Sequence, residues 1–299
     1  MNGFVSDFKN TWNKPNNSLA KLIIINVAVW VAVLVVYFIS QTTGNQAIYT
    51  VVFDNISIPR DISEFVFKPW TLLTYFFVHQ DFFHILFNML IMYWFGMLVQ
   101  EFLGTTKLVA LYLIGGLAGG LAYLLIFNLT PLFSQGGGSG MIGASASVYA
   151  IVVGAATLMP DYRMNLIFIG PVKIKYIAAV YIFLSFIGTA GSNAGGNVAH
   201  LGGALMGFIF IKQMQKGNDW SKPVNSVLEF FSGLFSRRPK MKVSYRKTAG
   251  ARNGKSKGKA DTPNQADVDA ILDKISESGY ETLSAEEKEI LFKASQKNS

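Results

Sequence analysis

A serine set among small residues is the first feature of the sequence that could perform covalent chemistry. Ser145 lies in the motif Gly143-Ala-Ser-Ala, between a glycine-rich loop and an apolar run that ends at Pro160. Small neighbours allow another helix to approach the hydroxyl closely. A serine in an apolar helix, however, usually donates its proton to a backbone carbonyl of the preceding turn. Whether Ser145 is a nucleophile therefore depends on whether the chain supplies a base.

The candidate bases are the three histidines of the chain, His79, His84 and His200. A serine hydroxyl is unreactive until a base accepts its proton, and imidazole titrates near neutrality. We expect His200 to be the general base for Ser145. No aspartate or glutamate lies in the outer half of any apolar run, so the residues favour a serine–histidine dyad over a Ser-His-Asp triad. Tyr149, one turn after Ser145, could pack its ring on the imidazole.

A second pair of polar residues could stabilise negative charge. His84 and Asn88 are four residues apart, so they share one face of a helix. Their side-chain N–H groups, with the backbone N–H of Ser145, could donate to an oxyanion. A purely structural role in hydrogen bonding between helices is the alternative for each histidine taken alone. Because polar groups in apolar spans are costly and lie here at similar depths, we expect them to share one cavity.

Metal and cofactor chemistry has little support in the residue pattern. The spacing of His79 and His84 differs from the H-E-x-x-H pattern of helical zinc proteases, and no carboxylate is in register with it. The chain has no cysteine, which excludes disulfides, zinc–thiolate sites and thiol catalysis. We therefore expect neither a metal ion nor a cofactor.

The composition indicates an all-α membrane protein that crosses the bilayer several times. The chain has 299 residues, 51% of them hydrophobic, and its mean hydropathy is positive. The first apolar run lacks a small-residue cleavage site and is interpreted as a retained signal anchor. Six runs are expected to be helical spans: Leu22–Ile39, Phe83–Val99, Leu108–Ile126, Ser145–Met159, Ile174–Ile187 and Val198–Ile211.

The fourth run is too short to cross a membrane. At 1.5 Å per residue its helix would be about 22 Å long, against a hydrocarbon core of about 30 Å. Ser145, at its start, is therefore expected below the membrane surface, entered through a loop that lines a cavity. The loop 41–82 is rich in aromatic residues and is expected to be partly sunk in the outer interface, with an ordinary folded extramembrane loop as the alternative.

Loop charges predict the orientation of the bundle. The loops after the third and fifth runs carry no charge, whereas those after the second and fourth carry cations. By the positive-inside rule both termini are cytoplasmic and Ser145 lies toward the outer side, in a membrane expected to be the bacterial inner (plasma) membrane. The cations in or beside these loops are Lys107, Arg163, Lys173 and Lys175.

After the last apolar run the sequence becomes polar and basic. Residues 224–235 are amphipathic enough to lie on the inner interface. Residues 237–259 contain ten basic and no acidic side chains and are expected to be drawn to anionic lipid, by about 1 kcal/mol per charge. No nucleic acid is expected as a partner, because no folded basic face or aromatic platform accompanies this charge. Ser284-Ala-Glu-Glu287 predicts a capping box that opens a helix.

The predicted domain organisation follows from these changes in composition. It comprises a cytoplasmic N-terminal segment at 1–17, a six-span membrane domain at 18–215, an interfacial helix with a basic linker at 216–260, and a small helical hairpin of unassigned role at 261–299.

Three segments together resemble a known family. They are Trp70-Thr-Leu-Leu-Thr through His79 and His84-Ile-Leu-Phe-Asn88, then Gly143-Ala-Ser-Ala with Tyr149, and Asn197-Val-Ala-His200-Leu-Gly-Gly203 with Gly207. In these motifs, and over about residues 18–215, the chain resembles the rhomboid family of intramembrane serine proteases.

The resemblance implies a six-helix fold and assigns roles to the motif residues. Ser145 would be the nucleophile and His200 its base. His84, Asn88 and the Ser145 amide would form the oxyanion hole. Tyr149 would pack against His200, and Gly203 would let the fourth and sixth helices approach closely.

The chain departs from the family pattern at three positions. Thr71 follows Trp70 where the family usually has arginine, so the arginine-based bracing of that loop is in question. Gln100 stands four residues after Gly96 where glutamate is frequent. Ala146 replaces the glycine that often follows the nucleophile, and its methyl group could tighten the oxyanion region.

The function expected is cleavage of a peptide bond in or beside a transmembrane helix of a membrane-protein substrate. Small residues at the cleaved bond and helix-weakening residues nearby should be favoured, since a helix hides its carbonyls in its own hydrogen bonds. A non-catalytic relative that binds or escorts transmembrane helices is the alternative. A small transporter is less supported, because the sequence has no internal repeat or intramembrane carboxylate.

Overall fold

The computed structural model describes residues 3–130, 140–235 and 265–295. The chain divides into two units, Met1–Arg238 and Pro239–Ser299, and each is considered by itself. The predicted lipid-binding segment 237–259 lies outside the described residues, as does most of the glycine-rich loop that precedes Gly140.

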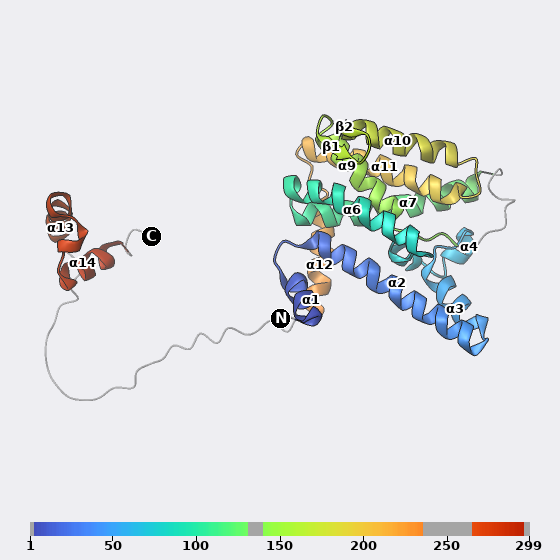
Figure 1. Ribbon diagram of the computed structural model, residues 1–299, viewed down its shortest axis with the longest axis horizontal. Coiled ribbons are helices and arrows are strands. Elements are labelled where there is room, and N and C mark those ends of the chain that lie inside the picture. Colours follow the sequence, from blue (N-terminus) through green and yellow to red (C-terminus); the bar gives the residue numbers. More distant parts are fainter. Residues whose placement is uncertain (1–2, 131–139, 236–264, 296–299) are drawn as a thin grey trace. The chain divides into compact units, whose positions relative to one another are not determined.

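Six apolar helices form the body of the first unit, and each contains most of one predicted run (Figure 1). Four are long and apolar enough to cross a membrane, whereas α9 and α10 are shorter apolar helices. The protein is therefore an integral membrane protein. The helices are α2 (Ser18–Thr43), α6 (Phe82–Leu103), α7 (Thr105–Leu129), α9 (Ser145–Leu158), α10 (Ile174–Gly188) and α11 (Ala194–Gln215).

Local sequence determines where several of these helices begin and end. The Asp81 carboxylate accepts from the backbone N–H of His84 at 2.9 Å and so caps the first turn of α6. Asn193 caps α11 in the same way, accepting from the N–H of Gly196. Gly44 ends α2 in the left-handed conformation that glycine adopts without steric cost.

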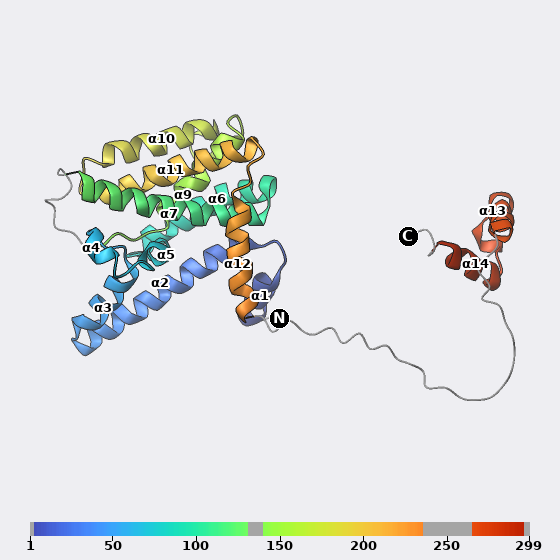
Figure 2. The same cartoon turned by 180° about the vertical axis from the view of Figure 1, so that it is seen from behind.

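The short helix α9 lies at the centre of the bundle, with α11 on one side of it and α7 on another. In both ribbon views α10 and α11 run along one edge, and α2 runs along the opposite edge (Figures 1 and 2). Ten residues of α9 are buried, including Ala146 and Ala150. A methyl group added at Gly203 or Gly207 of α11 would overlap the backbone carbonyl of Ala146 or Ala150. Glycine at these positions therefore lets α11 contact the α9 backbone directly.

The segment between α2 and α6 is folded throughout much of its length. It contains α3 (Gln46–Ile56), α4 (Ile62–Phe65), α5 (Thr71–Thr74) and the 3₁₀ turn η1 (Tyr75–Phe77). The Trp70 indole donates to the carbonyl of Asn55 at 2.9 Å, and the Thr74 hydroxyl donates to that of Ile56 at 2.9 Å. Thr71, at the position of the family's arginine, is fully buried and donates to the Lys68 carbonyl. Side-chain bonds from Trp70, Thr71 and Thr74 to the backbone thus brace this segment.

The sequence analysis did not predict the β-hairpin that joins α9 to α10. Strands β1 (Arg163–Leu166) and β2 (Gly170–Lys173) pair antiparallel. Asp161, just before it, accepts hydrogen bonds from the Lys173 and Lys175 ammonium groups, each at 2.8 Å. These bonds lower the pKa of Asp161 to about 2. The strands have only four residues each, too few for an alternating pattern to emerge.

Other helices precede and follow the six apolar helices in the sequence. Helix α1 (Phe4–Asn13) precedes α2, and α12 (Ser221–Phe235) contains the predicted amphipathic segment 224–235.

The second unit consists of α13 (Gln265–Ser278), the 3₁₀ turn η2 (Tyr280–Thr282) and α14 (Ala285–Ser295). The predicted capping box is confirmed there. The Glu287 N–H donates to the Ser284 hydroxyl at 3.2 Å, and the Ser284 N–H donates to the Glu287 carboxylate at 2.7 Å.

The glycine contact between α9 and α11 yields a stability prediction. Gly203→Ala should lower the free energy of unfolding by about 1–3 kcal/mol, because the added methyl group forces the two helices apart. The measurement is thermal unfolding in detergent. Gly233→Ala is the matched control, since a methyl group there meets no atom within 4 Å in helix α12. Equal unfolding midpoints for the two variants would contradict the close-contact argument.

Candidate active site

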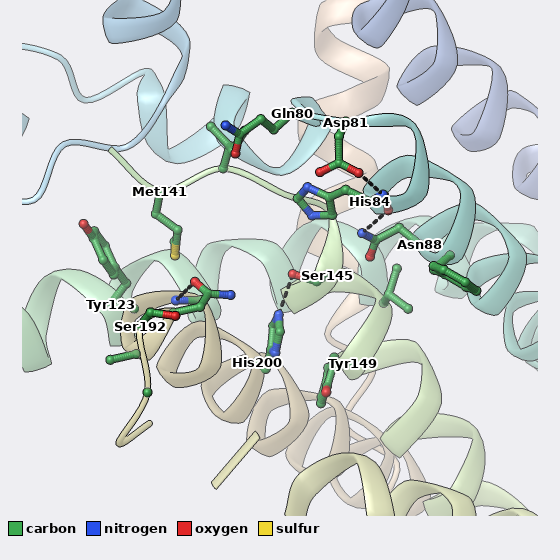
Figure 3. Close-up of a pocket in the computed structure, with 18 of the residues that line it drawn as sticks. Gln80, Asp81, His84, Asn88, Tyr123, Met141, Ser145, Tyr149, Ser192 and His200 are labelled. Atoms are coloured by element: carbon green, nitrogen blue, oxygen red, sulfur yellow. Dashed lines mark hydrogen bonds between the residues drawn. The ribbon is translucent and has the colours of Figure 1, made fainter. Parts of the chain in front are cut away.

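Ser145 and His200 meet across the interface between α9 and α11. The Ser145 Oγ lies 2.7 Å from Nε2 of His200, within hydrogen-bonding distance (Figure 3). Ser145 is the first residue of α9, and His200 lies in the second turn of α11. The Tyr149 ring stacks on the imidazole, with centroids 4.3 Å apart and planes 13° from parallel. The structure thus brings together the three residues that the sequence analysis assigned to the nucleophile, the base and its aromatic neighbour.

The backbone leading into Ser145 is held by a segment far away in the sequence. Met141 and Ile58 exchange two backbone hydrogen bonds, of 2.9 and 3.0 Å. The N–H of Gly143 donates to the carbonyl of Tyr75 at 3.0 Å. The folded segment between α2 and α6 therefore holds the backbone that leads into Ser145.

His84 and Asn88 reach the same cavity from α6. The His84 imidazole lies against Gly143, where a methyl group would come within 2.9 Å of its Nε2 atom. The Asn88 amide donates one N–H to the His84 carbonyl at 2.9 Å. An amide has two N–H donors, so the second remains for a group in the cavity. Both side chains line the cavity that contains Ser145 and His200, as the proposed oxyanion role requires.

This cavity has a volume of about 830 Å³. It combines side chains from α6, the loop before α9, α9 itself and the start of α11 (Figure 3). Its lining includes Gln80, Asp81, His84, Asn88, Tyr123, Met141, Ser145, Tyr149, Ser192 and His200.

The remaining predicted site residues lie outside the cavity and support it. His79 is fully buried behind His84, with ring centroids 5.0 Å apart. Burial lowers the pKa of His79 to about 3, and the nearby His84 adds to the effect. Asn197 donates to the carbonyls of Gly188 and Asn193, which ties the end of α10 to the start of α11.

Two of the departures from the family pattern have clear structural counterparts. Ala146 is buried, and its methyl group faces Gly119 of α7. The methyl group therefore packs between α9 and α7. The Gln100 side chain accepts from the backbone N–H of Leu19 at 3.1 Å. It thereby satisfies one of the free donors in the first turn of α2.

The sequence analysis missed Ser185 of α10. Its side chain is 2% exposed, and its hydroxyl lies 3.1 Å from Nδ1 of His200 and 2.8 Å from the Tyr149 hydroxyl. The available signal was a polar residue late in an otherwise apolar run, where polar groups rarely lack a role. That signal is weak for serine, since its own helix can satisfy the hydroxyl.

The geometry suits base-assisted attack by a serine. Nε2 of His200 is placed to accept the Ser145 proton, which is the arrangement of a nucleophile and its general base. His84 and Asn88 of α6, whose side chains carry N–H groups, line the same cavity.

Two family models match parts of the chain. A family model described as the Rhomboid domain matches residues 66–215, which include every cavity-lining residue assigned above to catalysis. A second model, a family of unknown function (DUF6576), matches residues 260–297.

Three curated proteins are similar to about half of the chain. RHOMBOID-like protein 12, mitochondrial, of Arabidopsis thaliana is 32% identical over 158 residues, 49% of this chain and 47% of that protein. RHOMBOID-like protein 1 of Arabidopsis thaliana is 27% identical over 163 residues, which are 52% of this chain and 39% of that protein. Rhomboid protein 1, mitochondrial, of Saccharomyces cerevisiae is 29% identical over 143 residues, which are 45% of this chain and 38% of that protein. The chain thus spans less than half the length of each of these relatives.

The backbone at Gly143 yields a prediction about the reactivity of Ser145. Gly143 has a φ of +127°, which disfavours any side chain, and a methyl group there would press on His84. Gly143→Ala should slow the phosphonylation of Ser145 by a fluorophosphonate by about tenfold or more, because strain of roughly 1–3 kcal/mol displaces the loop. Gly170→Ala is the control, with a φ of +86° but no atom within 4 Å. Equal slowing in both variants would show general backbone strain and no effect specific to the site.

Proposed function

The chain belongs to the rhomboid family, and on that basis we propose that it is an intramembrane serine endopeptidase that cleaves transmembrane segments of other membrane proteins. The observation that carries the proposal is the 2.7 Å hydrogen bond between Ser145 Oγ and His200 Nε2, in a cavity that also holds side-chain donors.

The proposed reaction has two steps. His200 takes the proton of Ser145 as Oγ attacks the carbonyl carbon of the peptide bond, and it then gives that proton to the leaving amine. Water attacks the resulting acyl-enzyme with His200 again as base, which releases the carboxylate and restores the serine. His84, Asn88 and the Ser145 amide would stabilise the oxyanion in both steps, where loss of one donor typically costs about 3 kcal/mol.

The substrate class follows from the position of the dyad between membrane helices. A transmembrane helix keeps its carbonyls in its own hydrogen bonds, so the substrate must unwind before Ser145 can attack. We propose that small residues at the cleaved bond, and glycine or proline nearby, make this unwinding easier. Water would enter the cavity from the side on which Ser192 and Asn193 lie.

We also propose that all six apolar helices lie within the bilayer, with both termini in the cytoplasm of a bacterial cell. The short helix α9 would begin below the outer surface, with its polar end facing the cavity. Its 14 residues extend only about 21 Å. Anionic lipid is the proposed partner of the basic segment 237–259. Two of the relatives are named as mitochondrial, so a mitochondrial location is the competing possibility.

The catalytic proposal predicts that the dyad is indispensable. Ser145→Ala and His200→Ala should each lower the cleavage of a transmembrane substrate in detergent by at least about a thousandfold, because neither residue works without the other. Both variants should also lose labelling by a fluorophosphonate. Ser147→Ala is the control, because Ser147 lies two residues after Ser145 on the same helix and its buried hydroxyl has no hydrogen-bond partner among the described residues.

Two results would overturn the proposal. Labelling of Ser145→Ala at the wild-type rate would place the reactive serine elsewhere. A wild-type protein that binds transmembrane peptides but cleaves none would support the non-catalytic, helix-binding alternative.

The orientation can be tested with single cysteines, because the natural chain has none. Ser192→Cys, in the exposed turn before α11, should react with a membrane-impermeant maleimide in intact bacterial spheroplasts. Lys216→Cys, at the other end of α11, should react only after the membrane is opened, because the basic side of the bundle stays in the cytoplasm. The wild-type chain supplies the background. The reverse pattern would invert the proposed topology.

A further inference from the structure

Ser185 links the catalytic pair to the neighbouring helix α10. Its hydroxyl lies 3.1 Å from Nδ1 of His200, on the opposite side of the ring from Ser145. We propose that Ser185 is a positioning residue that holds His200 in the tautomer able to accept the proton of Ser145. The inference rests on the proposed peptidase function and adds a residue to its machinery.

Hydrogen bonds connect His200 to Ser185, Ser185 to Tyr149, and Tyr149 to a backbone carbonyl, and this last acceptor determines the direction of each bond. The backbone carbonyl of Tyr181 can only accept, so the Tyr149 hydroxyl donates to it, at 3.4 Å. The oxygen of Tyr149 then accepts the proton of Ser185, at 2.8 Å. With its single proton committed, the Ser185 oxygen can only accept from Nδ1–H of His200.

This direction determines what His200 presents to the nucleophile. A neutral imidazole carries one proton, and with that proton on Nδ1 the Nε2 atom is a free acceptor. Ser145 Oγ lies 2.7 Å from this atom and can donate its proton there. The other tautomer would point an N–H at Ser145 and leave the serine without a base.

An ordinary structural role for Ser185 fits the contacts less well. A serine in a membrane helix normally donates to the carbonyl four residues earlier, which here belongs to Tyr181. That carbonyl instead receives the hydroxyl of Tyr149. The Ser185 hydroxyl points away from its own helix and contacts α9 and α11 together. Its side chain is 2% exposed, so water does not compete for these bonds.

The test measures kcat and KM separately for cleavage of one transmembrane substrate in detergent. Ser185→Ala should lower kcat by about tenfold, the value of one hydrogen bond, with KM changed by less than about twofold. Ser185→Cys, which keeps the volume but accepts hydrogen bonds weakly, should also lower kcat. Ser185→Thr retains the hydroxyl, and its kcat should be close to that of the wild type. Ser147→Ala is the matched control for loss of a buried serine hydroxyl and should retain wild-type kcat.

The outcomes separate this inference from the proposed function. If folded Ser185→Ala or Ser185→Cys retains the wild-type kcat, or if Ser147→Ala loses as much as Ser185→Ala, the positioning role is wrong while the peptidase stands. A rise in KM at constant kcat would also overturn it, because a positioning residue acts on the proton transfer. If the wild-type protein cleaves nothing and Ser145 is not labelled, the peptidase proposal itself fails.

Discussion

The direct contact between the backbones of α9 and α11 is the interaction on which the rest of the site depends. His200, Gly203 and Gly207 are spaced by three and four residues, so they share the face of α11 that meets α9. His200 therefore lies on the same helix face as the two glycines that bring the helices together. A wider separation would lengthen the 2.7 Å bond between Ser145 and His200 at once, since both residues are anchored to their helices. The packing of α9 against α11 thus also sets the distance between Ser145 and His200.

Helix α7 holds α9 against α11 by the same means. A methyl group at Gly115 or Gly119 would overlap the side chains of Ala150 and Ala146, the residues whose carbonyls face α11. Two alanines of α9 thus serve both interfaces, through their methyl groups on one side and their backbone on the other. This explains why alanine is accommodated next to the nucleophile, since its methyl group completes the packing with α7.

The features that were predictable from the sequence are those encoded by local pattern. Apolar runs identified the six helices, and the rarity of histidine made Ser145 and His200 a natural pair. The hydrogen bonds of Met141 with Ile58 were not predictable, because they join segments far apart in the sequence through backbone groups that every residue carries. The segment 41–82 was therefore interpreted as a loop, although it contains short helices and its backbone bonds hold the residues before Ser145. Ser185 was missed because a helical serine can satisfy its hydroxyl locally.

No carboxylate among the residues that the structure describes is hydrogen-bonded to His200, which is consistent with a position inside an apolar bundle. Placing an ionised aspartate at the centre of a membrane helix costs about 2.5–3.5 kcal/mol of free energy. A protease in water does not have this cost. Hydroxyl groups can orient the imidazole without that cost, provided that each proton finds an acceptor. The bonds from His200 through Ser185 and Tyr149 end on the Tyr181 carbonyl, which needs no proton of its own. A series of neutral hydroxyl groups can therefore fix the tautomer of His200 inside an apolar bundle. In the proposed reaction, the imidazolium would still donate from Nδ1 to the same Ser185 oxygen.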